Sequence, residues 1–193
     1  MVNLIRAYKP LQAADFTIVN LGSHAVANQC NSVAMSGGAG VGQSNITMLA
    51  KPIPATPYTV TLHAKDFQLG AAYYGYGLCF RDSVGKHIAA NVCYSGGSIY
   101  SNTSRVEAYY DVNSIAGAFA SGADCIWDQQ WFRVKDNGTN LYFYISADGV
   151  NWFLLYTLSR ATWVTPDQVG FFIDPFSAAA VVLFDSFEIN EHA

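Results

Sequence analysis

The chain has 193 residues, of which 51% are hydrophobic, 15% are aromatic and 12% are charged. This length fits one domain, and the aromatic content with so few charges argues against a disordered spacer. The net charge is −4 and the basic residues are scattered singly, so a nucleic-acid-binding face is not expected. No apolar run reaches the about 18 residues of a membrane span, and the first residues lack the pattern of a signal peptide.

Residues 1–12 are predicted to be an arm or edge strand ahead of a single domain over residues 13–193. Short strand-like stretches follow, separated by turn residues every 8–12 or so positions, as in a sandwich or barrel. Residues 36–42 are predicted to be a flexible loop, because the Lys-Ser/Thr pair of a phosphate-binding loop does not follow them. The stretches lie at 15–20, 25–28, 32–35, 45–49, 58–63, 71–81, 87–94, 98–100 and 105–110.

Residues 130–173 carry the clearest strand signals, with four strands predicted at 131–135, 141–146, 152–158 and 168–173. In the third of these, Leu154 and Tyr156 are expected on one face because strand side chains alternate. Gly149 is expected to adopt a positive φ in a tight hairpin that Asp148 caps through its side chain. Both faces are largely apolar, which places these strands inside a two-layer sandwich. A closing strand is predicted at 178–190.

Several of these segments resemble the concanavalin A-like lectin/glucanase superfamily. The similar segments are Trp131-x-Arg133, the hairpin Ser146-x-Asp148-Gly149-x-x-Trp152, the strand at 168–172 and the ending Phe184-Asp185-x-Phe187. The resemblance implies an all-β, antiparallel two-sheet β-sandwich of the jelly-roll type. The sequence is similar in particular to small proteins and terminal modules found among the structural proteins of tailed bacteriophages.

That resemblance implies a non-enzymatic structural or adhesive protein on the surface of a phage virion, as a capsid decoration, fibre or tail-associated protein. Other virion proteins would be its partners, host glycans a possible ligand, and the host cytoplasm its place of synthesis. The alternatives are a stand-alone carbohydrate-binding module and a polysaccharide hydrolase or lyase.

Two tryptophans and an arginine mark the predicted hairpin. Trp131 and Trp152 are expected to pack in or beside the core, the alternative being a contact with sugar. Arg133 lies in an apolar strand and is expected to pair with Asp185 or Glu188, because an unpaired buried charge is costly.

Aromatic residues in or near loops form a candidate sugar platform, since sugar-binding sandwiches use exposed aromatic faces. The alternatives are that each packs against a neighbour at a sheet edge, or that together they form a protein interface in a symmetric homo-oligomer. The candidates are Tyr94, Tyr100, Tyr109, Tyr110, Trp127 and Trp163.

No catalytic pair or metal set is predicted. A glycosidase needs two facing carboxylates, whereas Glu107 and Asp111 are four residues apart, and Asp185 and Glu188 are three apart and so expected on opposite faces. Asp124 and Asp128 flank Trp127 and could contribute to a calcium site, but two acids are few for one, so whether calcium is bound stays open; no cofactor is expected. Of four cysteines, Cys79 and Cys93 are expected to be buried thiols; disulfides among Cys30, Cys79, Cys93 and Cys125 remain open.

Overall fold

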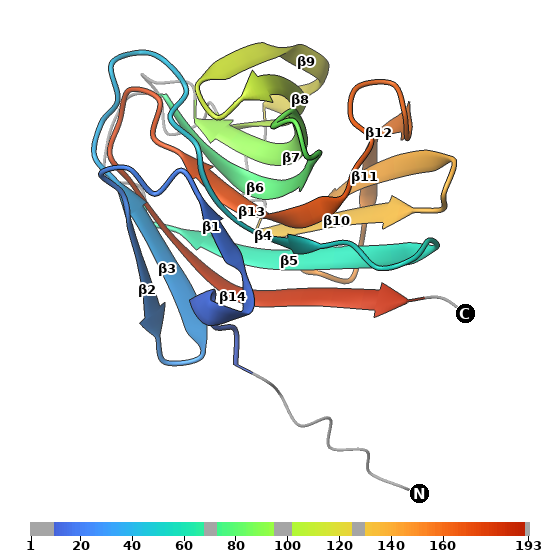
Figure 1. Cartoon of the computed structure of the whole chain (residues 1–193), viewed down its shortest axis with the longest axis horizontal. Helices are drawn as coiled ribbons and strands as arrows, with labels where there is room; N and C mark the ends of the chain where they lie inside the picture. Colours follow the sequence, from blue (N-terminus) through green and yellow to red (C-terminus); the bar gives the residue numbers. More distant parts are fainter. Residues whose placement is uncertain (1–9, 68–72, 95–101, 125–129, 192–193) are drawn as a thin grey trace, which may run out of the picture.

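The computed structural model describes residues 10–67, 73–94, 102–124 and 130–191. In these ranges the chain forms two seven-stranded antiparallel sheets packed face to face, as Figure 1 shows, and a single 3₁₀ turn at Ala13–Asp15. The predicted all-β, two-sheet sandwich is therefore confirmed. No helix within the described ranges is long and apolar enough to span a membrane.

Each sheet interleaves strands from distant parts of the chain. Sheet A consists, in spatial order, of β1 (Thr17–Val19), β4 (Thr47–Pro52), β13 (Gln168–Asp174), β6 (Tyr74–Arg81), β7 (His87–Tyr94), β8 (Asn102–Asp111) and β9 (Ser114–Asp124). Sheet B consists of β12 (Phe153–Ser159), β11 (Asn140–Ser146), β10 (Trp131–Asp136), β5 (Tyr58–Asp66), β14 (Ala180–Glu191), β3 (Ser32–Gly37) and β2 (Ala25–Gln29).

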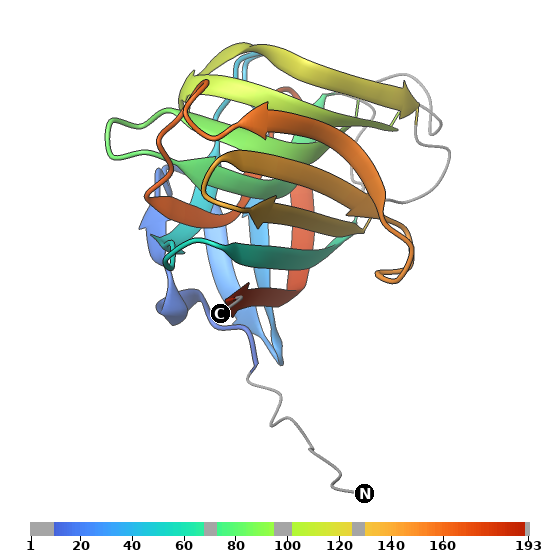
Figure 2. The ribbon, with the colours of Figure 1, turned by 90° about the vertical axis from the view of Figure 1, so that its right-hand side faces the viewer.

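The main core lies between the sheets and is built by alternation along the strands. Leu78 and Phe80 of β6 point into it from sheet A, and Phe132 and Val134 of β10 point into it from sheet B. The turned view in Figure 2 shows the strands of sheet B side by side. Because side chains alternate, the intervening residues of each strand lie on the outward face of its sheet.

The two outward faces differ in character. The outward face of sheet A carries a second buried cluster that includes Met48, Cys79, Tyr109 and Phe172. On the outward face of sheet B, Arg133 and Tyr144 are half-buried and Lys135 is exposed. The chain thus offers one partly covered face and one open face on which a site could form.

The β11–β12 hairpin has the conformation expected for its sequence. Gly149 has φ of 72°. The carboxylate of Asp148 accepts the backbone N–H groups of Val150 and Asn151, both at 2.8 Å. These hydrogen bonds hold the pKa of Asp148 well below its usual range. The indole of Trp131 packs against Gly149 and stacks on His63, with ring centroids 4.3 Å apart.

Two β-bulges overturn predictions based on strict alternation. A register shift between Phe143 and Tyr144 places Tyr156 opposite Phe143 but Leu154 opposite Tyr144, so Leu154 and Tyr156 face opposite sides of β12. A second shift lies between Phe184 and Ser186 in β14.

The second bulge also corrects the expectation for the two acids of β14. Asp185 sits in the bulge and its carboxylate bonds Nδ1 of His63 at 2.5 Å, on the outward face of sheet B. Glu188 lies opposite Thr61 on that same face. Asp185 and Glu188 therefore do not point to opposite sides of the sheet, as their spacing had indicated.

Some predicted segments shift or lie outside the description. Residues 114–124 form strand β9, although their small side chains had not indicated one. At the amino end the predicted strand at 15–20 shortens to β1. Residues 1–9, 71–72, 98–100 and 125–129 lie outside the described residues, so the predictions for them, Cys125 included, are not tested.

Candidate functional site

A pocket of about 270 Å³ opens on the outward face of sheet A, where β6, β7, β8 and β13 lie side by side. The cross-strand register explains its position, because Asn91 pairs with Arg105, and Ala89 with Glu107. Across the sheet, Gly75 of β6 pairs with Cys93 of β7 on one side and with Asp174 of β13 on the other. Because glycine has no side chain, space is left open above the sheet at this position. The residues that line the pocket include Tyr73, Gly75, Cys93, Arg105, Glu107 and Asp174.

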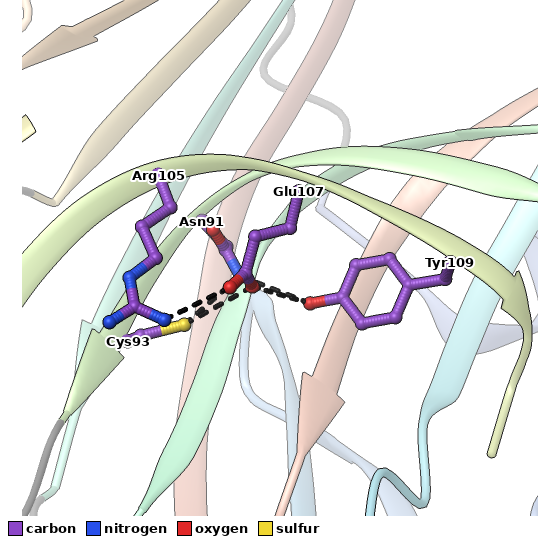
Figure 3. Close-up of polar contacts among 5 residues, drawn as sticks. All are labelled: Asn91, Cys93, Arg105, Glu107 and Tyr109. Carbon is purple, nitrogen blue, oxygen red and sulfur yellow. Dashed lines mark hydrogen bonds and ion pairs between the residues drawn. The ribbon is translucent and has the colours of Figure 1, made fainter. Parts of the chain in front are cut away.

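Glu107 lines this pocket and is the centre of a polar network, whose contacts Figure 3 shows. Its Oε2 accepts hydrogen bonds from Asn91 Nδ2 at 2.6 Å, from the Tyr109 hydroxyl at 2.7 Å and from the Cys93 thiol at 3.4 Å. Its Oε1 accepts from Arg105 Nη1 at 3.1 Å. Although the Glu107 side chain is only 5% exposed, these four donors compensate its buried charge.

Arg105 connects this buried network to the open pocket. Its side chain is 31% exposed and is held by Glu107. Its Nε is buried and has no hydrogen-bond partner among the described residues. Because Nε is shielded from solvent, a ligand in the pocket would meet other atoms of this partly exposed side chain.

A second carboxylate, Asp174 of β13, reaches the same pocket. It is 4% exposed and accepts the backbone N–H of Asn45 at 2.9 Å. Burial, and to a smaller extent the nearby charge of Glu107, raise the pKa of Asp174 to about 6. Burial likewise raises the pKa of the Cys93 thiol and of the Tyr109 hydroxyl, so both are protonated donors at neutral pH.

The rim of the pocket is aromatic. Tyr73 is 52% exposed, and its ring lies edge-on to Phe176 with centroids 6.2 Å apart. Tyr109 at the floor stacks on His87, with ring centroids 4.5 Å apart. The pocket thus combines a fixed polar floor with an accessible aromatic edge.

The predicted sugar platform is divided between two places. Tyr94 and Tyr109 are both buried and contribute to the pocket wall. Tyr110 and Trp163 contact each other elsewhere, with ring centroids 5.3 Å apart, in a shallow groove beside Phe119. Tyr100 and Trp127 lie outside the described residues. The structure therefore brings the described candidates together only in pairs.

The predicted ion pair of Arg133 is not found. Asp185 bonds His63, and Glu188 forms no ion pair with Arg133 in the described ranges. Arg133 instead donates from Nε to Thr61 Oγ1 at 3.1 Å and stacks on Trp152. The charge is stabilised by an aromatic face and a hydroxyl, which a search for carboxylates does not consider.

Sequence reasoning missed the grouping of Asn91, Arg105 and Asp174 with Glu107. These residues come from β7, β8 and β13, which the strand order of sheet A brings to one face, with β6 between β13 and β7. The polar residues at alternate positions of β8, Arg105 and Glu107, were the only local signal. Among the described residues, no cluster of His, Cys, Asp and Glu could hold a metal ion.

No protein-family model matches the chain, and no curated protein matches it. Solved structures do share its fold. A functionally unknown protein from Saccharomyces cerevisiae superposes with a TM-score of 0.68 at 14% identity, over 95% of this chain and 100% of that one. A legume lectin-like domain from Entamoeba histolytica gives 0.63 at 13% identity, over 96% and 95%.

A carbohydrate-binding module, CBM2 of the evolved Dit of Lactobacillus casei BL23 phage J-1, gives a TM-score of 0.58 at 10% identity, over 86% of this chain and 78% of that one. Two GH43 proteins and a xylan β-1,4-xylosidase from Bacillus halodurans also match, but the match covers only 34% and 33% of their chains, respectively. At these identities the comparisons establish the fold alone: the chain has the two-sheet β-sandwich of lectin-like and carbohydrate-binding domains.

Proposed function

We propose that the protein binds carbohydrate without cleaving it, through the pocket on the outward face of sheet A. The observation that carries this proposal is the combination of the exposed Tyr73 ring with the partly exposed Arg105, which Glu107 holds in place, in one pocket. Ligand pockets typically join aromatic walls to a few well-placed polar groups. A sugar ring can place its apolar C–H face against the aromatic wall and its hydroxyl groups against the polar groups.

The floor of the pocket favours recognition of hydroxyl groups over charge. The charge of Glu107 is matched by that of Arg105, and Asp174 has a raised pKa, close to 6. At neutral pH Asp174 is mostly ionised, so the floor carries about one net negative charge beside its fixed donors and acceptors, which disfavours an anionic ligand more than the hydroxyls of a neutral sugar. The lectin-like and carbohydrate-binding neighbours support the proposal only through the shared fold.

A pair of exposed tyrosines allows a matched test. Tyr73 and Tyr110 are 52% and 55% exposed, but only Tyr73 lines this pocket. A glycan array should identify a ligand, and titration calorimetry should then show that Tyr73→Ala weakens binding about tenfold or more while Tyr110→Ala does not. The reverse result would place the site in the Tyr110–Trp163 groove and refute the pocket.

A second variant tests the pocket by filling it. A Cβ at Gly75 would lie 3.5 Å from the Cys93 sulfur, an ordinary contact, so Gly75→Val should fold and obstruct the pocket. The control is Gly38→Val, since a Cβ at Gly38 would meet no atom within 4 Å. Unchanged glycan binding by folded Gly75→Val would contradict the proposal.

Glycoside hydrolysis is the second candidate, because Glu107 and Asp174 face one pocket and burial raises the pKa of Asp174 to about 6. A carboxyl group with such a pKa is suited to act as a general acid. Against this, the carboxylate of Glu107 already accepts four hydrogen bonds. We expect no release of reducing ends from the glycan that binds; release abolished by Glu107→Gln and by Asp174→Asn would establish the enzyme instead.

We further propose that the protein acts on the surface of a phage virion, as a decoration, fibre or tail-associated homo-oligomer. The resemblance of its sequence motifs to phage structural proteins supports this setting, and one solved structure of the same fold comes from a phage Dit protein. Mass spectrometry of purified particles tests the proposal, because a virion component must be present at stoichiometric levels.

A further inference from the structure

A second groove lies on the outward face of sheet B, on the opposite side of the sandwich from the pocket. Its volume is about 510 Å³, and β5, β10, β11 and β14 contribute to it. These strands run side by side in Figure 2. The residues on which the argument rests are Thr61, Arg133, Lys135, Tyr144, Trp152 and Asn190.

Two cations occupy the middle of this groove. Arg133 and Lys135 are two residues apart on β10 and therefore share a face, about 7 Å apart along the strand. Arg133 is flanked across the sheet by Thr61 and Tyr144. The register therefore encloses the two positive charges between hydroxyl groups on one side and an aromatic ring on the other.

Arg133 is held in place by neutral neighbours. Its guanidinium carbon lies 3.7 Å from the ring centroid of Trp152, and its Nε donates to Thr61 Oγ1 at 3.1 Å. A stacked guanidinium loses little freedom on binding an oxyanion, because its planar fork is already oriented. Trp152 and Thr61 thus orient the terminal amino groups of Arg133.

The positive charge of the groove is not neutralised by ion pairs within the described ranges. Arg105 and Arg160 each pair with a carboxylate, whereas neither Arg133 nor Lys135 does so. Glu188 is the acid that faces them, opposite Thr61, and its charge acts on Arg133 without an ion pair. The residues that line the groove include these two cations and no acid, so the lining is net positive; Glu188 and Asp185, the latter bonded to His63, lie beside it on the same face.

We propose that this groove binds an acidic saccharide, with an oxyanion such as a carboxylate seated between Arg133 and Lys135. An oriented guanidinium fork favours bidentate oxyanion contacts. Tyr144 supplies an aromatic flank, and Thr61 and Asn190 supply hydroxyl and amide groups, which suit sugar rings better than a simple inorganic anion. This site shares no residue with the pocket on sheet A, so an experiment can refute either proposal without affecting the other.

The test uses the full chain and a uniform acidic trisaccharide. Trigalacturonate should bind in titration calorimetry at low ionic strength, and the neutral galactose trimer should bind about tenfold more weakly or not at all. Added salt should weaken the binding of trigalacturonate, because the contact is between opposite charges that remain partly exposed.

Charge-removing variants locate the site. Arg133→Gln and Lys135→Gln should each reduce trigalacturonate affinity, Arg133→Gln by about tenfold. Lys65→Gln removes the same charge from an exposed position on β5 that does not line the groove, and should have no effect. Tyr73→Ala, in the pocket on sheet A, should also have no effect. Because Lys135 is exposed, its variant remains informative if Arg133→Gln does not fold.

Three outcomes would overturn the assignment. Absence of trigalacturonate binding at millimolar concentration is one, and affinity unchanged in both Arg133→Gln and Lys135→Gln is another. Polyglutamate or inorganic phosphate binding as tightly as trigalacturonate at these residues would indicate an anionic peptide site or a simple anion site, and not a saccharide site.

Discussion

At the scale of single residues, Gly149 shows how backbone conformation and a neighbouring ring act together. Its φ is 72°, and a Cβ would lie 2.8 Å from Cε2 of Trp131. Gly42 has a similar φ of 79° but no atom within 4 Å of its Cβ position. A comparison of substitutions at the two glycines therefore separates the cost of backbone strain from the cost of steric overlap.

We expect Gly42→Ala to lower the free energy of unfolding by about 1 kcal/mol, from strain alone. Gly149→Ala should lower it by about 2–3 kcal/mol, because overlap with Trp131 adds to the strain. Urea denaturation of both variants measures the difference. Equal losses would mean that Trp131 moves aside at no cost.

Asp174 predicts a pH dependence of stability. Its pKa is raised to about 6 in the folded protein, above the value of an unfolded aspartate. Between about pH 4 and pH 6 the folded state therefore holds a proton that the unfolded state has lost, so this residue makes stability fall as pH rises through that window.

The variant Asp174→Asn should remove that contribution while still accepting the N–H of Asn45 through its amide oxygen. We expect it to raise the free energy of unfolding at pH 7.5 by up to about 3 kcal/mol, with the gain vanishing toward pH 4. Thermal melts of both proteins from pH 4 to pH 8 test this. A gain independent of pH would show that the charge of Asp174 is not responsible.

At the scale of elements, one buried carboxylate joins three segments of sheet B. Asp136 at the end of β10 is fully buried and accepts from Tyr58 of β5 at 3.0 Å, from the backbone of Gly138 at 2.9 Å and from Arg160 Nε at 2.9 Å. Arg160 follows β12 and is the charge partner of this carboxylate.

Arg160→Met should cost about 3 kcal/mol, because it leaves the charge of Asp136 buried without its cation. Adding Asp136→Asn to Arg160→Met should recover part of that loss, since it removes the uncompensated charge. Chemical denaturation of the two single variants and the double variant gives the coupling energy. Strictly additive losses would show that the two residues act independently.

Elements also show what the sequence could and could not predict. The alternation around Phe132, Val134 and the Asp148–Gly149 turn predicted both strands and hairpin, because those signals are local. The bulges next to Tyr144 and Asp185 carry no comparable signal. One inserted residue reverses every side chain beyond it, so Leu154 and Asp185 were assigned to the wrong faces.

The site was harder to predict than the fold for a related reason. Glu107 and Asp174 come from strands separated in sheet A by β6 and β7, and their meeting depends on sheet order. Reasoning from spacing along one strand could consider only Asp111 as the second carboxylate beside Glu107. The partner of Arg133 was also missed, because this charge is stabilised by the indole ring of Trp152 and not by a carboxylate.

At the scale of the whole molecule, the amino-terminal boundary can be tested by truncation. Leu11 is 7% exposed, and its N–H donates to the Asn31 carbonyl at 3.1 Å, so the sandwich includes this residue. Deleting residues 1–9 should leave the melting temperature unchanged but abolish the proposed assembly, whereas deleting residues 1–12 should lower the melting temperature.

Differential scanning fluorimetry and light scattering measure the two effects separately. If the segment docks on a partner by adding a strand to a sheet edge, assembly alone depends on it. Early melting of the shorter deletion would show that residues 1–9 belong to the domain core, and the docking proposal would fail.

The last two strands of the described chain lie in the middle of the sheets. β13 is inserted between β4 and β6, and β14 between β3 and β5. On the ribosome β3 and β5 are complete by Asp66, but the strand that joins them ends only at Glu191. At a synthesis rate of about 5–20 residues per second, β3 and β5 each keep an unpaired edge for on the order of ten seconds before β14 is made. The nascent chain therefore cannot close either sheet as it emerges, and its vulnerable period for aggregation lasts until synthesis has passed β14.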